Sequence, residues 1–173
     1  MAYAMRPVSA SDLPMLRRWV QTPECVRWWG EPVEQYALLQ EDLSNPLMRM
    51  RIVSLEGRPF AYVQDYDIGS WPQAHLAHLP AGARAIDTFI GEPDLIGRGH
   101  GSAYLRLVAE RLIAEGAPCV VIDPDPKNER ARRAYAKAGF VEDRVVQTPE
   151  GAAVLMVFRP RPNDLTLPLD GGG

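Results

Sequence analysis

The sequence predicts a mixed α/β fold, with one domain over residues 1–159 and a tail rich in proline and glycine over residues 160–173. Short apolar runs alternate along the chain with segments of helical periodicity, which is the pattern of strands and helices mixed in one domain. The length of 173 residues is that of one ordinary domain. Hydrophobic residues make up 46 % and charged residues 24 %, which is typical of globular proteins and excludes a disordered or fibrous chain.

In the first third of the chain, the sequence pattern predicts one strand and two helices. Ala4–Val8 is a short candidate strand. Ser9 or Ser11 is a suitable N-cap for a helix, and that helical segment ends at Trp28-Trp29-Gly30. A second helix is expected from Val33 to Leu43, where apolar residues recur on one face.

The middle of the chain predicts a hairpin, a long loop and a further strand. Arg49–Leu55 and Pro59–Asp67 flank Gly57, which is a hairpin signal. Residues 68–84 have no clear period, and a loop of this length inside a domain is usually functional when it is ordered. A strand then resumes at Arg84–Ile90.

The second half predicts two strong helices and three strands. The helices have apolar residues at helical spacing and glycine at their ends. The expected elements are a glycine-rich turn at Leu95–Gly101, helices at Ser102–Glu115 and Asn128–Ala138, a buried strand at Ala117–Ile122, and a closing hairpin of Phe140–Val146 with Ala153–Phe158.

Charge and cysteine usage limit the partners and the cellular compartment. The net charge of −3 argues against a nucleic-acid partner, and no apolar run reaches the 18–20 residues of a membrane span. Met1–Pro7 has no apolar run typical of a secretory signal, and Cys25 and Cys119 are expected to be free thiols, so we expect a cytoplasmic protein. Cysteine and histidine form no metal-ligand spacing, so no metal is expected. The chain is expected to be a monomer or a homodimer.

A glycine-rich turn, Gly97-Arg98-Gly99-His100-Gly101, stands between a predicted strand and a predicted helix. Such a turn exposes backbone N–H groups, and the helix dipole favours a phosphate at that end. Arg98 adds a positive charge. A tight connection without a ligand explains the turn equally well, so the motif is weak evidence when taken alone.

Two motifs at the right distance resemble the GNAT superfamily of N-acetyltransferases. The first is Ile96-Gly97-Arg98-Gly99-His100-Gly101, in which Ile96 stands where the family has Gln or Arg. The second is Asn128-Glu129-Arg130-Ala131 followed by Tyr135-Ala136-Lys137-Ala138-Gly139-Phe140. The resemblance covers residues 5–158. It implies the GNAT fold, a central, mostly antiparallel twisted sheet with a splayed parallel pair of strands, flanked by helices.

The resemblance also implies acetyl-CoA as the co-substrate and assigns residues to it. Tyr135 would protonate the departing thiolate, although a helix-face aromatic in the core explains the same residue. The strand before the turn would pair with the pantetheine arm, and a backbone N–H in it would polarise the thioester carbonyl. The predicted cofactor contacts are Thr88, Ile90, Arg98, Gly99, His100, Gly101, Ser102, Asn128 and Arg130.

Further segments resemble the aminoglycoside 6′-N-acetyltransferase branch, among them Val26-Arg27-Trp28-Trp29-Gly30 and Thr148-Pro149-Glu150-Gly151. Acidic residues are concentrated in residues 60–97, which suits a cationic acceptor. The resemblance makes Asp87 the residue that orients and deprotonates the amine. The predicted acceptor contacts are Trp28, Trp29, Gln64, Asp65, Trp71, Asp87 and Asp123.

The expected reaction is direct attack of a primary amine, the 6′-amine of an aminoglycoside, on the thioester. No cysteine is placed beside a histidine as a nucleophile, so no covalent intermediate is expected. One alternative keeps the chemistry and changes the acceptor to a siderophore hydroxylamine, a protein N-terminus or a polyamine. Another is a coenzyme A-binding module without turnover.

Overall fold

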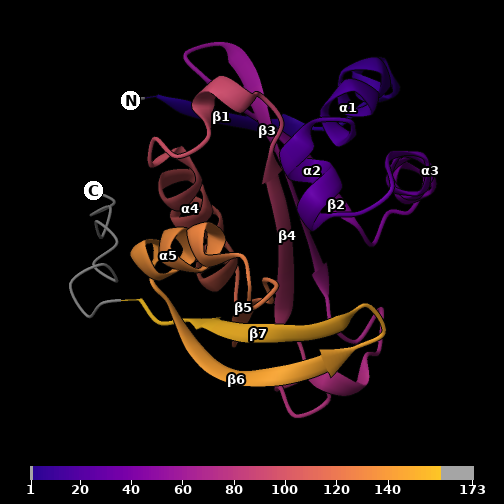
Figure 1. The fold of residues 1–173 in the computed structure, drawn as a ribbon. Coiled ribbons are helices and arrows are strands. Elements are labelled where there is room, and N and C mark those ends of the chain that lie inside the picture. Colours follow the sequence, from indigo (N-terminus) through magenta and orange to yellow (C-terminus); the bar gives the residue numbers. More distant parts are fainter. Residues whose placement is uncertain (1, 161–173) are drawn as a thin grey trace, which may run out of the picture.

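One mixed sheet organises the protein (Figure 1). The computed structural model describes residues 2–160. The strands lie in the order β1-β2-β3-β4-β5-β7-β6, and every neighbouring pair is antiparallel except β4 and β5. Their bounds are β1 Tyr3–Pro7, β2 Arg49–Leu55, β3 Arg58–Asp67, β4 Arg84–Ile90, β5 Val120–Ile122, β6 Phe140–Thr148 and β7 Gly151–Phe158. The predicted fold class is confirmed, including the parallel pair.

Helices cover both faces of the sheet, with the first three on one side and the last two on the other (Figure 1). Their bounds are α1 Leu13–Val20, α2 Pro23–Trp28, α3 Pro32–Leu43, α4 His100–Ala114 and α5 Glu129–Ala138. Three short 3₁₀ turns, Ala10–Asp12, Ala74–Leu76 and Pro93–Leu95, lie in the connections.

Strand alternation gives the sheet two separate cores, because successive side chains point to opposite faces. On β3, Val63 packs with α4 in one buried cluster. Its neighbour Tyr62 packs with Trp19 and Ile52 in the other, beneath α1 and α3. Residues next to each other on one strand therefore face different helices.

The parallel strands β4 and β5 separate soon after they meet. Their register joins Arg84 to Val120 and Ala85 to Val121. Among the described residues no strand pairs with that edge of β4 beyond Ala85. The divergence opens the sheet between β4 and β5, with α5 on one side and α2 on the other (Figure 1).

Several element boundaries differ from the prediction by a few residues, among them strand β5, which begins at Val120 and not at Ala117, and two of the differences have a clear cause. The first predicted helix is divided between Val20 and Pro23, because proline lacks the N–H that would continue α1 and holds Thr22 in extended backbone. Helix α4 begins at His100, two residues earlier than predicted. Its N-cap is Gly99 with φ of 85°, a backbone conformation that favours glycine.

The long loop is ordered by one short turn. Residues 74–76 form a 3₁₀ turn within the predicted loop, and it buries Leu76 in a third apolar cluster with Val146 and Ala153 of the β6–β7 hairpin. The predicted tail, apart from residue 160, lies outside the described residues.

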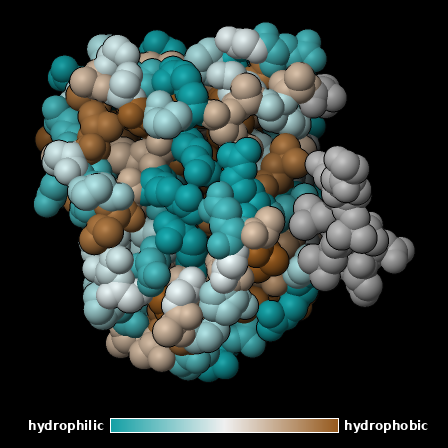
Figure 2. All heavy atoms as spheres, turned by 180° about the vertical axis from the view of Figure 1, so that it is seen from behind, coloured by the Kyte–Doolittle hydropathy of each residue, from teal (hydrophilic) through white to brown (hydrophobic). Residues whose placement is uncertain are grey.

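Hydrophilic side chains occupy the middle of the face opposite to that of Figure 1, and apolar patches on it are small and separate (Figure 2). Of the helices in the described range, none combines the length and the apolar character that crossing a membrane requires.

Candidate active site

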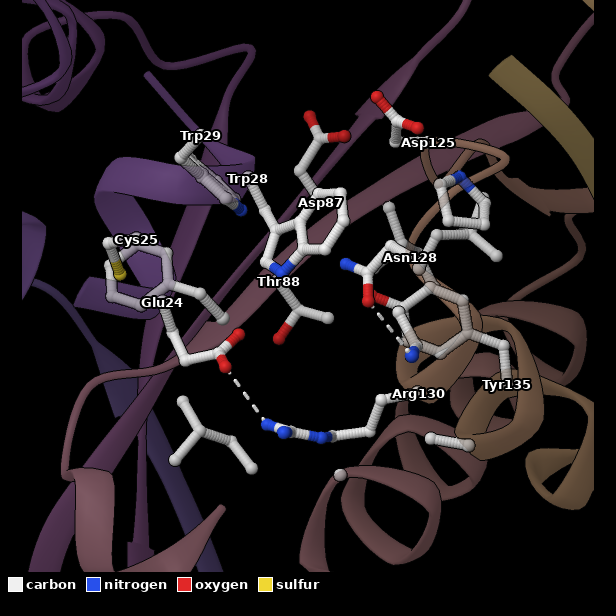
Figure 3. Close-up of a pocket in the computed structure, with 18 of the residues that line it drawn as sticks. Glu24, Cys25, Trp28, Trp29, Asp87, Thr88, Asp125, Asn128, Arg130 and Tyr135 are labelled. Carbon is white, nitrogen blue, oxygen red and sulfur yellow. Dashed lines mark hydrogen bonds and ion pairs between the residues drawn. The ribbon is translucent and has the colours of Figure 1, made fainter. Parts of the chain in front are cut away.

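A cleft of about 490 Å³ lies where β4 and β5 separate. Because the sheet is open there, residues from both of its faces line one cavity. Helices α2 and α3 form one wall, and the N-terminal parts of α4 and α5 form the other. Figure 3 draws this pocket, with Asp87 and Asp125 on one side of the view and the Glu24–Arg130 pair on the opposite side.

The glycine-rich turn presents backbone amides to this cleft. Gly97, Gly99, Gly101 and Ser102 line the cleft. Within residues 2–160, the amide groups from Gly99 to Ser102 donate to no protein acceptor. This is the expected state of the first turn of a helix, which has no preceding carbonyls to bind. The turn is therefore free to bind an anion such as a phosphate.

His100 contributes to this turn through its backbone. Its imidazole points into the core, where Nδ1 lies 2.8 Å from the Tyr3 hydroxyl and the ring packs edge-on against Phe60. Arg98 is exposed and does not line the cleft. The Ser102 hydroxyl donates to the carbonyl of Ala134, so it ties α4 to α5.

Residues at the start of α5 lie on the same wall as the glycine-rich turn, facing α2. Asn128 is the N-cap, and its Oδ1 accepts a hydrogen bond from the Ala131 amide. Arg130 extends across the cleft to Glu24 of α2, with Nη1 3.0 Å from Oε1 (Figure 3). This ion pair joins two elements more than a hundred residues apart in the sequence.

Asp87 lies on β4 and is held by a chain of hydrogen bonds. Gln64 of β3 is its register partner and donates from Nε2 to Asp87 Oδ2 at 2.9 Å. The Tyr62 hydroxyl donates to Gln64 Oε1 at 2.6 Å, which fixes the direction of the amide. Burial, with the nearby charge of Asp123, raises the pKa of Asp87 well above the usual range of a carboxyl. A carboxylate with a raised pKa is a better proton acceptor.

Asp123 follows β5 and provides a second carboxylate in the cleft. Burial and the charge of Glu150 raise its pKa as well. His75, from the long loop, lies with Nε2 3.2 Å from Asp123 Oδ2. Glu150 itself lies in the β6–β7 turn and also lines the cleft. The acidic groups give this end of the cavity a strong preference for cations.

Tyr135 of α5 faces the same cavity. Burial, with the neighbouring Tyr104 and the carboxylates, raises the pKa of its hydroxyl, which therefore keeps its proton at neutral pH. The hydroxyl of Tyr104 lies 2.6 Å from Thr88 Oγ1, and Thr88 Oγ1 donates to the Tyr62 carbonyl. Tyr135 thus combines a retained proton with exposure to the cleft, as a general acid requires.

Both tryptophans of the Trp-Trp-Gly segment line the cleft. Trp29 packs edge-on against Phe89 with ring centroids 4.8 Å apart. The guanidinium of Arg27 lies 4.6 Å from the ring centroid of Trp28. Trp29 therefore joins the core to the cavity wall.

Two residues predicted to bind the acceptor lie elsewhere. Asp65 is 2 % exposed and points to the α4 face, where Arg49 and Arg84 bind its Oδ2 at 3.1 and 2.7 Å. The prediction for Asp65 is wrong because it is next to Gln64 on one strand, and neighbours on a strand face opposite ways. Trp71 packs against Tyr66 and is not among the residues that line the cleft.

Several residues that line the cleft were not predicted to function, namely Glu24, Tyr104, Asp125 and Glu150. Glu150 lies in the turn motif that carried the resemblance, so that motif contained a signal. The other three reach the cleft only through the tertiary fold. Cys25 also lines it, but burial raises the pKa of its thiol to about 11, so it is not a nucleophile at neutral pH.

Comparison with known proteins identifies this arrangement as that of an acetyltransferase. Residues 9–148 match the family model described as an acetyltransferase (GNAT) domain. The chain therefore belongs to the GNAT acetyltransferases, as the two motifs predicted. Among characterised proteins it is similar to aminoglycoside N(6′)-acetyltransferase type 1 of Klebsiella pneumoniae, with 32 % identity over 166 residues, which cover 88 % of this chain and 81 % of the relative.

Solved structures extend the similarity to the whole fold. The structure of AAC(6′)-Ib with paromomycin and acetyl-CoA matches with a TM-score of 0.83 and 30 % identity, covering 96 % of this chain and 98 % of that one. AAC(6′)-Ib with coenzyme A and kanamycin matches with a TM-score of 0.80 and 32 % identity, covering 90 % and 94 %.

Proposed function

We propose that this N-acetyltransferase uses acetyl-CoA to acetylate an aminoglycoside at a primary amine, the 6′-amine. The observation that carries the proposal is the position of Asp87 and Asp123 in the same cleft as the free amides of the glycine-rich turn. One end of the cavity favours an anion and the other a cation. The similarity to aminoglycoside N(6′)-acetyltransferases supports the choice of acceptor.

The residues present fit coenzyme A. The unpaired amides from Gly99 to Ser102 suit its diphosphate, and the free edge of β4 beyond Ala85 suits the amide groups of its pantetheine arm. Arg130 offers a further positive charge near that path. The same cavity therefore contains a partner for each chemical part of the molecule.

The acceptor end fits a molecule with several ammonium groups. Asp87, Asp123 and Glu150 supply acidic oxygens, while Trp28 and Trp29 supply flat apolar surface. Carboxylates bind ammonium groups, and aromatic rings cover the faces of sugars and attract cations. This combination favours a polycationic sugar over a protein N-terminus.

In the proposed reaction, acetyl-CoA supplies the acetyl group as a thioester. Asp87 takes a proton from the acceptor ammonium, directly or through water, and so frees the lone pair for attack on the carbonyl carbon. The carbon–nitrogen bond forms and the carbon–sulfur bond breaks. Tyr135 gives its proton to the departing sulfur, and the second proton that the nitrogen loses on becoming an amide returns to the Tyr135 oxygen, directly or through water. Cys25 takes no part, since its thiol stays protonated.

The test is acetyl transfer to kanamycin. The purified protein with acetyl-CoA should release coenzyme A and yield a product with one acetyl group on the 6′-amine, located by NMR. Expression of the chain should also raise the aminoglycoside tolerance of a susceptible cell. No turnover of aminoglycosides, together with good turnover of a peptide or a hydroxylamine, would reject this acceptor.

The cytoplasmic location, the single domain and the number of subunits stay predictions.

A further inference from the structure

His75 occupies an unusual position for a loop residue. Its side chain is 4 % exposed, although the loop of residues 68–83 contains no helix or strand apart from one short turn. The imidazole lies against Asp123, with Nε2 3.2 Å from Oδ2. His75 is not among the residues that line the cleft, whereas Asp123 is. The histidine can therefore reach an acceptor only through the carboxylate.

The direction of this hydrogen bond follows from its chemistry. An ionised carboxylate only accepts hydrogen bonds, so Nε2 must carry the proton. Burial lowers the pKa of His75, so the ring is neutral at neutral pH and donates as an N–H group. A carboxylate has about four acceptor positions, so this contact leaves others for a ligand.

The loop is anchored independently of His75. Leu76 is buried in the cluster that contains Val146 and Ala153, and Gln73 donates from Nε2 to the Tyr66 hydroxyl at 3.2 Å. These contacts fix the backbone on either side of the histidine. The loop therefore does not need His75 to hold its backbone in place. The contact of His75 with Asp123 orients the carboxylate.

We propose that His75 positions Asp123 for binding an acceptor ammonium group, and so makes the long loop part of the acceptor site. This inference rests on the proposed function. His75 is a positioning residue, because it holds the carboxylate and does not touch the acceptor. It also gives the predicted functional loop a specific role that does not depend on Trp71.

The kinetic test compares two variants of His75 that differ in hydrogen bonding. His75→Phe keeps the bulk of the ring and removes the donor, while His75→Gln keeps an N–H donor. H75F should raise the KM for kanamycin about tenfold, the effect of one lost hydrogen bond to a charged group, and leave the KM for acetyl-CoA within twofold. H75Q should recover most of the affinity.

His78 provides the matched control, since it is exposed in the same loop. His78→Phe should leave both KM values unchanged. An unchanged KM for kanamycin in H75F, an equal rise in the KM for acetyl-CoA, or no recovery in H75Q would each overturn the proposal. If H75F does not fold, His75→Met fills the same space with a flexible apolar chain and replaces it.

A second measurement is independent of the acceptor. Titration of the Asp123 carboxyl carbon by NMR reports the contact directly, in the presence of the same neighbours, Asp87 and Glu150. Loss of the His75 donor should move the Asp123 titration to higher pH, and an unchanged titration would overturn the inference. Failure of the wild-type protein to acetylate kanamycin would instead reject the proposed function and leave this titration valid.

Discussion

At the scale of single residues, the behaviour of Asp87 depends on one amide donor and on burial. Gln64 supplies the donor, and Tyr62 fixes the orientation of that amide. Gln64 is a neutral donor and brings no positive charge to the carboxylate, so Asp87 remains basic enough to accept a proton. Its register pairing with Gln64 explains why the two sequence-predicted residues meet.

Asp87→Asn should abolish acetyl transfer and leave acetyl-CoA binding unchanged. General-base catalysis contributes about 10²–10⁴-fold, so turnover should fall at least a hundredfold. Steady-state kinetics and calorimetry measure the two properties separately. Asp94→Asn is the control, because Asp94 is exposed and paired with Arg58. Wild-type turnover by D87N would remove Asp87 from the mechanism.

Activity should depend on pH through the same carboxyl. The pKa of Asp87 is raised to about 7 by burial, and only its ionised form accepts a proton. We therefore expect kcat/KM for the acceptor to fall as the pH decreases below about 7. A pH profile measured with kanamycin checks this, and a rate that stays constant down to about pH 5 would contradict it.

The raised pKa of Asp87 should also influence stability. The folded-state value of about 7 lies above the ordinary value of about 3.9, so the carboxyl destabilises the fold increasingly as the pH rises from about 4 to 7. D87N should therefore melt higher than the wild type at about pH 8, by roughly 2–4 °C for each kcal/mol gained. The difference should disappear near about pH 4. A lower melting temperature for D87N at the higher pH would be the opposite result.

At the scale of elements, the turn before α4 combines two kinds of glycine. Gly99 has a positive φ and sets the direction of the chain, whereas Gly101 lies in the helix and leaves room beside the amides. A Cβ on Gly101 would meet Ile90 Cδ1 at 3.8 Å, an ordinary contact. The fold therefore does not require a residue without a Cβ at position 101.

Gly101→Ala should raise the KM for acetyl-CoA and leave the melting temperature unchanged. The added methyl group meets no clash within the protein and lies where the diphosphate is proposed to bind. Gly116→Ala, at the other end of α4, is the converse control. Its φ of 105° should cost about 1–2 kcal/mol of stability without affecting the KM for acetyl-CoA. Equal KM values in G101A and the wild type would argue against the turn as the phosphate site.

The ion pair between Glu24 of α2 and Arg130 of α5 leads to a second prediction at the scale of elements. Glu24→Gln should free Arg130 for a cofactor phosphate and lower the KM for acetyl-CoA by about two- to fivefold, as expected for a partly exposed pair. Glu129→Gln is the control, because Glu129 pairs with Arg133 on the exposed side of α5. A higher KM in E24Q would mean that the pair supports the cofactor site.

The elements were largely predictable because the spacing of apolar residues and the positions of glycine and proline are local properties of the sequence. Helix α5 and the β2–β3 hairpin follow from apolar spacing and from glycine at their ends. The break before Pro23 could have been predicted from that proline alone. Contacts such as Glu24 with Arg130 were not predictable, since nothing local links residues so far apart in the chain.

At the scale of the whole molecule, strand alternation separates a carboxylate that stabilises the fold from one that lies in the cleft. Asp65 and Asp87 lie on neighbouring strands, yet Asp65 is buried with Arg49 and Arg84 beneath α4 while Asp87 lies in the cleft. Motif recognition from the sequence identified the family correctly. The sequence-based prediction placed Asp65 in the acceptor site because a carboxylate beside Gln64 can equally well bind an ammonium group or pair with buried arginines.

Asp65→Asn should therefore behave in the opposite way to D87N. Loss of the charge under two arginines should lower the free energy of unfolding by about 1–3 kcal/mol, while the KM for kanamycin stays unchanged. Chemical denaturation and kinetics on the same preparation measure both quantities. A raised KM for kanamycin at full stability would restore Asp65 to the acceptor site.

The early separation of β4 from β5 has a consequence for solubility. An unpaired strand edge is normally a template on which a foreign chain can add and start aggregation. Here the edge is recessed between α2 and α5, so a slender amide-bearing ligand can reach it more easily than a second folded protein can. The recess therefore protects the unpaired edge of β4 from self-association and leaves it open to the pantetheine arm that we propose binds there.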